Sequence, residues 1–235
     1  MTKVLLPMLK LISCRSYVDL HSCPQFKEVQ MTDKFPVHIA GSVLMALSIK
    51  VAAFAGNVPT ELPGLLNFHE VHSYLYRGGG PSEKSMHDLK DKGVKTIIDL
   101  RAPSEGKPKS ERTKEDDPIQ PKEEKAIAEQ LGMKYVHMTM DSHAPTKSQV
   151  HTFIDAVEKA EKGEGGPVFL HCAHGSDRTG CLVGIWRVTH DNYDYDKAYQ
   201  EMRKYFFNTK FTKLSGAVKQ YADDKATHVT VSKQQ

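Results

Sequence analysis

Short apolar runs alternate with amphipathic segments along most of this chain. The clearest runs are residues 94–100 (VKTIIDL) and 167–171 (PVFLH), which have the length of strands buried on both faces. Strands separated by helices imply a mainly parallel sheet that is covered by helices. The sequence therefore predicts an α/β fold with a mainly parallel central sheet flanked by helices.

Further elements follow from periodicity and from cap signals. Two more strands are expected at 71–76 and 135–140, and two helices at 82–92 and 122–131. Thr146 and Gln149 have the spacing of a capping box, so they predict the start of a third helix. After 167–171 the pattern is helical to the end of the domain. Ligands in such sheets bind at the carboxyl ends of the strands.

Composition narrows the class of partner. The chain has 235 residues, 39% of them hydrophobic, which is enough for one domain with a full core plus extensions. Its 32 basic and 29 acidic residues nearly cancel, leaving a net charge of +3. Bulk charge therefore gives no reason to expect a nucleic-acid partner.

The N-terminal part has the pattern of an export signal. Residues 31–55 contain Lys34, an uncharged apolar run at 39–49 and an A-x-A sequence at 53–55. We interpret them as a cleavable signal peptide, and residues 1–30 as an over-extended start or a disordered leader. The alternatives are a membrane anchor and a buried helix. The expected protein is a monomer that is periplasmic or secreted, touches the membrane only transiently through the signal peptide, and comprises a domain at 56–225 with a frayed tail at 226–235.

One internal stretch is unusually charged. Residues 101–121 contain ten charged side chains and four prolines. This composition indicates a solvated surface insertion or a mobile flap.

The most informative segment surrounds the strand 167–171. Cys172 follows that strand directly, and Arg178 comes at the start of the next helix. The intervening backbone N–H groups can point inward and form an anion site at a helix N-terminus. Such a site lowers the pKa of a thiol, which makes Cys172 a candidate nucleophile. Arg178 can hold two phosphate oxygens at once.

The neighbouring side chains fit the same chemistry. Thr179 places a hydroxyl where it can donate to the sulfur, and His171 can orient the loop through hydrogen bonds. The residues expected to bind the substrate phosphate are Ala173, His174, Gly175, Ser176, Asp177 and Arg178. A metal site formed by His171, Cys172 and His174 is disfavoured, because adjacent strand residues point to opposite faces.

The C-x5-R sequence from Cys172 to Arg178, with a strand before it and DRTG at 177–180, resembles the protein tyrosine phosphatase superfamily. The chain looks like its compact dual-specificity branch from about Phe68 to Phe207. The segments LYRGGGP at 75–81 and TIIDLR at 96–101 resemble the early strands of small bacterial and fungal members.

That resemblance implies a metal- and cofactor-independent phosphomonoester hydrolase with a phosphocysteine intermediate. Its expected substrates are proteins that carry phosphotyrosine, phosphoserine or phosphothreonine. An inositol polyphosphate or phosphoinositide is the alternative substrate. A catalytically silent phosphate-binding module is the alternative of another class.

The general acid has three candidates. Family members carry an aspartate on a loop ahead of the cysteine, and Asp141 lies at the corresponding place, directly after the strand at 135–140. Asp177 resembles the loop aspartate that some relatives use, but it also suits a helix cap. His143 is a third, weaker candidate. Separately, Cys181 on the next helix is either a core residue or a thiol that forms a disulfide with oxidised Cys172.

Overall fold

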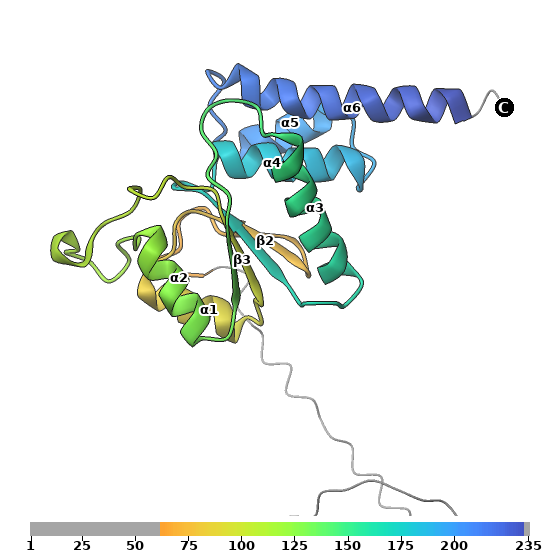
Figure 1. Ribbon diagram of the computed structural model, residues 1–235. Coiled ribbons are helices and arrows are strands. Elements are labelled where there is room, and N and C mark those ends of the chain that lie inside the picture. The colour runs from red at the N-terminus through yellow and green to blue at the C-terminus, as the bar shows by residue number, and fades with distance from the viewer. Residues whose placement is uncertain (1–61, 233–235) are drawn as a thin grey trace, which may run out of the picture. The chain divides into compact units, whose positions relative to one another are not determined.

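The computed structural model describes residues 62–232, and their side chains as far as residue 226 (Figure 1). The predicted signal peptide at 31–55, the segment before it, and the two cysteines Cys14 and Cys23 lie outside the described residues. Within the described part of the chain, no helix has both the length and the apolar character that crossing a membrane requires.

The centre of the fold is a five-stranded sheet in the order β1-β2-β5-β3-β4. Its strands are β1 (His69–His72), β2 (Leu75–Gly78), β3 (Thr96–Asp99), β4 (Lys134–His137) and β5 (Val168–His171). β2, β5, β3 and β4 run parallel to one another, and β1 is antiparallel at the edge. The predicted α/β class and mainly parallel sheet are confirmed.

Two predicted strands differ from the structure. The expected strand at 71–76 is wrong as a single element, because the chain turns at Ser73 and Tyr74 and returns as β2, which places Leu75 beside Val168 in the sheet. β4 ends at His137 rather than Met140. Beyond it, the N–H groups of Met138 and Met140 still donate to the carbonyls of Asp99 and Leu100.

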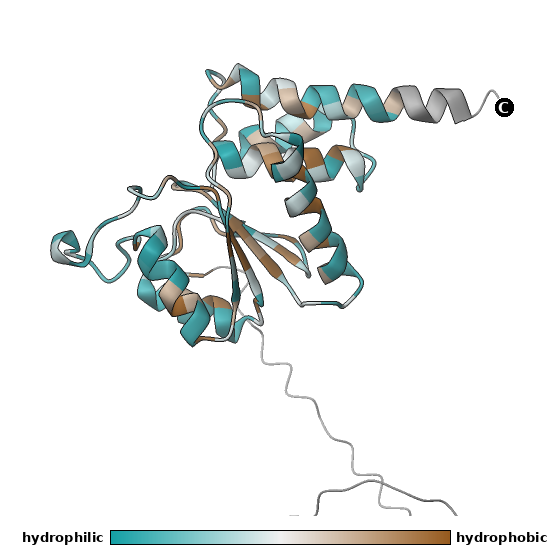
Figure 2. Ribbon diagram, in the orientation of Figure 1, coloured by the Kyte–Doolittle hydropathy of each residue, from teal (hydrophilic) through white to brown (hydrophobic). Residues whose placement is uncertain are grey.

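Helices cover both faces of the sheet (Figure 1). α1 (Glu83–Asp91) and α2 (Pro121–Gln130) lie on one side. The other side carries α3 (Lys147–Glu161), α4 (Asp177–Thr189), α5 (Tyr195–Lys204) and α6 (Thr212–Ser232). The strands in the middle are largely hydrophobic (Figure 2), as expected for a sheet buried between two helical layers.

Alternate strand residues supply the two cores. Ile97 and Phe169 pack with Met86 of α1 and Ala128 of α2. Their neighbours Ile98 and Leu170 pack in the second core, together with residues of α3 and α4 such as Phe153 and Trp186. This alternation follows from the two-residue period of a strand. It fixes β3 and β5 in register, so their carboxyl ends meet at one edge of the sheet.

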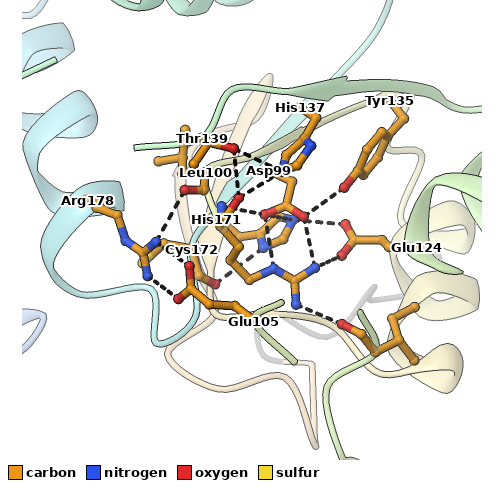
Figure 3. Close-up of polar contacts among 12 residues, drawn as sticks. Asp99, Leu100, Glu105, Glu124, Tyr135, His137, Thr139, His171, Cys172 and Arg178 are labelled. Atoms are coloured by element: carbon orange, nitrogen blue, oxygen red, sulfur yellow. Dashed lines mark hydrogen bonds and ion pairs between the residues drawn. The ribbon is translucent and has the colours of Figure 1, made fainter. Parts of the chain in front are cut away.

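A buried ionic network lies at that edge (Figure 3). The Arg101 guanidinium donates to Asp99 at the end of β3, at 3.0 and 2.9 Å, and also contacts Glu124 of α2. His171 at the end of β5 lies 2.9 Å from Glu124 through Nε2. The Tyr135 hydroxyl donates to Asp99 at 2.7 Å. Two carboxylates thus face a guanidinium and an imidazole, and the four charged side chains are at most 1% exposed.

The carboxylates of Asp99 and Glu124 lie close enough to His171 to suggest a metal site. Arg101 already supplies the cation between them, because its guanidinium contacts both carboxylates. We therefore interpret this cluster as a structural ionic network, which joins β3, α2 and β5 behind the sheet edge.

Removing one charge from the network tests its role in stability. Glu124→Gln leaves the two buried cations, Arg101 and His171, with the single carboxylate of Asp99 between them, and we expect it to lower the free energy of unfolding by about 3–5 kcal/mol. Glu129→Gln on the same helix is the matched control, because that side chain is 64% exposed. Urea denaturation measures both variants. Equal stability of the two variants would contradict the structural role of the network.

Candidate active site

The site is the loop of residues 172–176, between β5 and α4. The register of the sheet places Gly78, His171 and Asp99 side by side, so Cys172 emerges at the carboxyl edge between β2 and β3. α4 begins at Asp177 and contains Arg178 in its first turn. This arrangement brings a cysteine and an arginine to the two ends of one short loop.

Each carbonyl of this loop accepts a hydrogen bond on the outside of the loop. The donors to residues 172–176, in order, are His171 Nδ1 (3.3 Å), Gly80 N (3.1 Å), Asn67 Nδ2 (3.4 Å), Arg77 Nη2 (2.7 Å) and Gly180 N (2.9 Å). In a trans peptide, the carbonyl of one residue and the N–H of the following residue point in opposite directions, so a carbonyl that is bonded outside the loop turns the following N–H inward. Among the described residues, the N–H groups of 173–178 donate to no backbone carbonyl. They therefore face a common cradle that suits an anion.

Gly175 permits the tightest part of this turn. Its φ is +70°, a conformation that disfavours other residues. A Cβ atom there would lie 2.5 Å from the carbonyl carbon of Gly78. The glycine therefore lets the loop pack directly on the end of β2.

Cys172 lies at the base of the cradle and is 2% exposed. Burial raises the pKa of its thiol, but the charge of Arg178 and the hydrogen bonds from Thr179 and the His174 amide outweigh it, so that the pKa lies below its usual value. The Thr179 hydroxyl is buried and has no oxygen or nitrogen partner among the described residues. That leaves it free to stabilise the thiolate.

Arg178 is held by a carboxylate that the sequence analysis did not identify. Its Nη1 and Nη2 atoms donate to Glu105 at 2.8 and 2.7 Å (Figure 3). Nη1 also lies 3.3 Å from the carbonyl of Leu100 and 3.2 Å from that of Met140. Burial lowers the pKa of Arg178, but the bonds to Glu105 and the charge of Cys172 more than offset this and raise it. The guanidinium is thus cationic and fixed beside the cradle.

Glu105 belongs to the charged stretch 101–121, so this stretch is more than a solvated insertion or a flap. The Ala102 N–H donates to Glu105 at 2.6 Å. Further along, Asp117 accepts from Lys107 and from the amides of Thr113 and Lys114. A short 3-10 helix lies between, at Lys109–Glu111. The start of the stretch thereby contributes directly to the site.

Two of the three candidate acids, Asp141 and Asp177, have different surroundings, and the third, His143, contacts Asp141. Asp141 directly follows Met140, whose carbonyl contacts Arg178. Its carboxylate accepts from the N–H and Nδ1 of His143 at 2.7 and 2.9 Å, which holds the pKa of Asp141 below its usual value, and its side chain is 70% exposed. Asp177 is the first residue of α4 and accepts from the Asn208 N–H at 2.7 Å. Asp177 therefore ties the loop to the α5–α6 connection and is not a cap, since Ser176 occupies the N-cap position.

The remaining predicted residues lie around the cradle. His171 is completely buried. Burial lowers its pKa, but the charges of Glu124 and Asp99 outweigh that effect and raise it, which favours a ring that donates from both nitrogens. It thus connects the ionic network to the Cys172 carbonyl. His174 is exposed, and Ala173 is partly buried.

Cys181 has the surroundings of a core residue. Its thiol is completely buried and donates to the Leu214 carbonyl in α6 at 3.3 Å. Burial raises its pKa to about 12. These contacts match the core alternative for Cys181, not the disulfide-forming one.

Residues 63–220 match the family described as a DSP-PTPase phosphatase fused to NAD+ kinase. The chain belongs to this family. It is therefore a compact dual-specificity-like member of the protein tyrosine phosphatase superfamily, and its relatives indicate a cysteine-based phosphatase.

Curated relatives agree with this assignment. The dual specificity protein phosphatase TpbA of Pseudomonas aeruginosa (strain UCBPP-PA14) is 24% identical over 139 residues, which is 59% of this chain and 54% of the relative. Inositol diphosphatase DSP3 of Arabidopsis thaliana is 28% identical over 123 residues, covering 52% of this chain and 53% of the relative. The chain thus spans about half the length of these relatives.

Solved structures share the fold. The crystal structure of P. aeruginosa TpbA has a TM-score of 0.51 and 20% identity, and covers 66% of this chain and 84% of that one. The core catalytic domain of the PP-IP phosphatase SIW14 from S. cerevisiae has a TM-score of 0.52 and 21% identity. The match covers 72% of this chain and 93% of that one. At this identity the likeness establishes the architecture alone.

The pairing of Glu105 with Arg178 predicts how the thiol titrates. Glu105→Gln removes a negative charge that partly cancels Arg178, so the thiol pKa of Cys172 is expected to fall further, by about 0.5–1 pH unit. The pH dependence of alkylation by iodoacetate measures it. Glu111→Gln, an exposed residue of the same stretch, serves as control. An unchanged or raised alkylation midpoint in Glu105→Gln would refute this electrostatic role.

Proposed function

We propose that this protein hydrolyses phosphomonoesters through a phosphocysteine intermediate, and that its substrates are proteins carrying phosphotyrosine, phosphoserine or phosphothreonine. One observation carries the proposal: the outward-bonded loop turns its amides toward a thiol of lowered pKa, with a fixed arginine beside it. Such a cradle suits the equatorial oxygens of a transferring phosphoryl group.

The reaction has two steps. The Cys172 thiolate attacks phosphorus, so that a P–S bond forms while the P–O bond of the ester breaks. The loop amides and Arg178 stabilise the charge on the equatorial oxygens. Asp141 donates a proton to the leaving oxygen and then accepts one from the water that hydrolyses the P–S bond.

The lowered pKa of Asp141 has a consequence for this scheme. Without substrate the carboxyl is ionised at neutral pH, and only its protonated form is the acid. A bound phosphate dianion raises that pKa by repulsion between like charges. Activity is therefore expected to decline as the pH rises above the acidic range, while the thiolate persists.

The loop composition favours a single phosphate group. Between Cys172 and Arg178 it contains His174 and Ser176 but no lysine, so it offers no extra ammonium for a second phosphate. TpbA provides a parallel, because a cysteine-to-serine variant was crystallised in complex with phosphotyrosine and shares the fold with a TM-score of 0.52.

An inositol polyphosphate remains the second candidate substrate. A cavity of about 480 Å³ between α1 and the charged stretch is lined by Lys84, His87, Lys109, Arg112 and Lys114, together with Glu83 and Glu115. Two of these cations are already paired, Lys84 with Asp88 and Arg112 with Glu123. The names of the relatives DSP3 and SIW14 point to the same chemistry. Phosphate release from phosphotyrosine peptides and from inositol hexakisphosphate, measured side by side, decides between the two substrates.

Export is a further proposal and rests on the pattern of residues 31–55 alone. A monomeric state is likewise a prediction. Neither depends on the chemistry of the site.

The nucleophile is tested with the full chain and p-nitrophenyl phosphate. Cys172→Ser is expected to lower kcat at least about 1000-fold, because a serine hydroxyl is not ionised at neutral pH. Cys181→Ser, the matched control, should retain wild-type activity. The wild-type rate should resist EDTA and fall with vanadate.

Two results would contradict the proposed hydrolase function. Turnover by Cys172→Ser would exclude the proposed nucleophile. A wild-type protein that binds phosphate but releases none from any ester would instead support the silent binding module.

The acid is tested by comparing Asp141→Asn with Asp177→Asn. Asp141→Asn should lower kcat about 100-fold or more for a poor leaving group and flatten the decline of kcat toward alkaline pH. Asp177→Asn should affect stability more than that decline, because the Asp177 carboxylate accepts from Asn208. The pH profile of kcat is the measurement. If only Asp177→Asn flattened the profile, the role of acid would pass to Asp177.

A further inference from the structure

Arg77 is a buried arginine with few hydrogen-bond partners. It lies in β2, pairs in register with Leu170 of β5 and is 0% exposed. Its Nη2 donates to the Gly175 carbonyl at 2.7 Å, and its guanidinium carbon lies 4.5 Å from the centre of the Tyr205 ring. Its Nε and Nη1 atoms have no hydrogen-bond partner among the described residues.

Such a side chain is costly to bury. A guanidinium with two unmade hydrogen bonds in the interior loses hydration that protein groups do not replace. Burial lowers the pKa of Arg77 to about 10, so it stays cationic at neutral pH. Glu201, the acidic group with the largest effect on it, is already paired with Arg187 at 3.0 Å. The structure therefore keeps a cation behind the phosphate loop with little local compensation.

The position of the single hydrogen bond that Arg77 makes, to the Gly175 carbonyl, suggests why the fold keeps this buried cation. Gly175 is the loop residue in the left-handed conformation, where a peptide can flip most easily. A flip of the 175–176 peptide would turn a carbonyl into the cradle and remove the Ser176 N–H from it. Arg77 holds that carbonyl outside, and its bond is the shortest of those made by the loop carbonyls.

We propose that Arg77 is a positioning residue for the phosphate site: from beneath the loop it fixes the Gly175–Ser176 peptide so that the Ser176 amide faces the substrate, and it adds positive charge behind the cradle. This inference rests on the proposed phosphatase function. Arg77 touches neither substrate nor sulfur in this assignment, and acts through the loop.

Two substitutions separate its charge from its geometry. Arg77→Met removes the charge, whereas Arg77→Lys keeps the charge but loses the planar fork. Arg203→Met is the control, because Arg203 is an arginine of α5 that donates to the Phe207 carbonyl but to no loop carbonyl. Thermal unfolding reports the stability of each variant.

The readouts are the affinity for inorganic phosphate, measured as protection of Cys172 from iodoacetate, and the pH midpoint of that alkylation. The charged and titratable groups around the thiol are Arg178 and Asp177 on α4, His171 on β5, His174 in the loop, Glu105 on the stretch after β3 and Arg77 on β2. All but Arg77 are unchanged in these variants, so a shift of the midpoint reports on Arg77. Neither readout requires turnover, which keeps this test separate from that of hydrolysis.

Arg77→Met is expected to weaken phosphate binding at least about tenfold and to raise the alkylation midpoint. Arg77→Lys should restore the midpoint while phosphate binding stays weakened. Arg203→Met should change neither, whatever its unfolding temperature.

Wild-type phosphate affinity in a folded Arg77→Met protein would overturn the proposal, as would an equal loss of affinity in Arg203→Met. If Arg77→Met does not fold, Arg77→Lys decides, and wild-type phosphate affinity in that variant would overturn the proposal.

Discussion

The outward hydrogen bonds of the loop carbonyls are the interaction on which the site depends. Backbone amides can bind an anion only if their carbonyls are satisfied elsewhere, because every peptide carries both groups. Here the donors come from β2, the segment before β1, β5 and α4. The cradle is thus a product of the whole carboxyl edge of the sheet, not of the cysteine loop alone.

The ionic network behind that edge extends the same logic. His171 bonds the first loop carbonyl with one nitrogen and Glu124 with the other. Glu124 and Asp99 in turn share Arg101. The ends of β3 and β5 and the start of α2 are therefore held together by charges that balance one another. Such a support is rigid, and rigid support is what a preorganised anion site needs.

Much of this arrangement could be predicted from local sequence. The short apolar runs at 94–100, which is β-branched, and at 167–171 predicted β3 and β5, and the order of strands and helices predicted the sheet type. Cys172 and Arg178 are close in sequence, so their meeting at one loop needs no long-range information.

The missed features involve distant segments. Glu105 lies in a stretch whose composition is that of a surface loop, and only its place just after β3 connects it to Arg178. Arg77 was predicted to follow a strand that ends at residue 76, but it lies within β2, is buried and supports Gly175. The turn at Ser73 and Tyr74 was missed because the residues around it have the composition of one continuous strand.

The most direct test of the central claim is a crystal structure of the protein with orthovanadate bound. The account predicts vanadate attached to the Cys172 sulfur, with its equatorial oxygens accepting from the N–H groups of residues 173–178 and from Arg178. An anion bound elsewhere, or a loop carbonyl turned toward the vanadate, would contradict it.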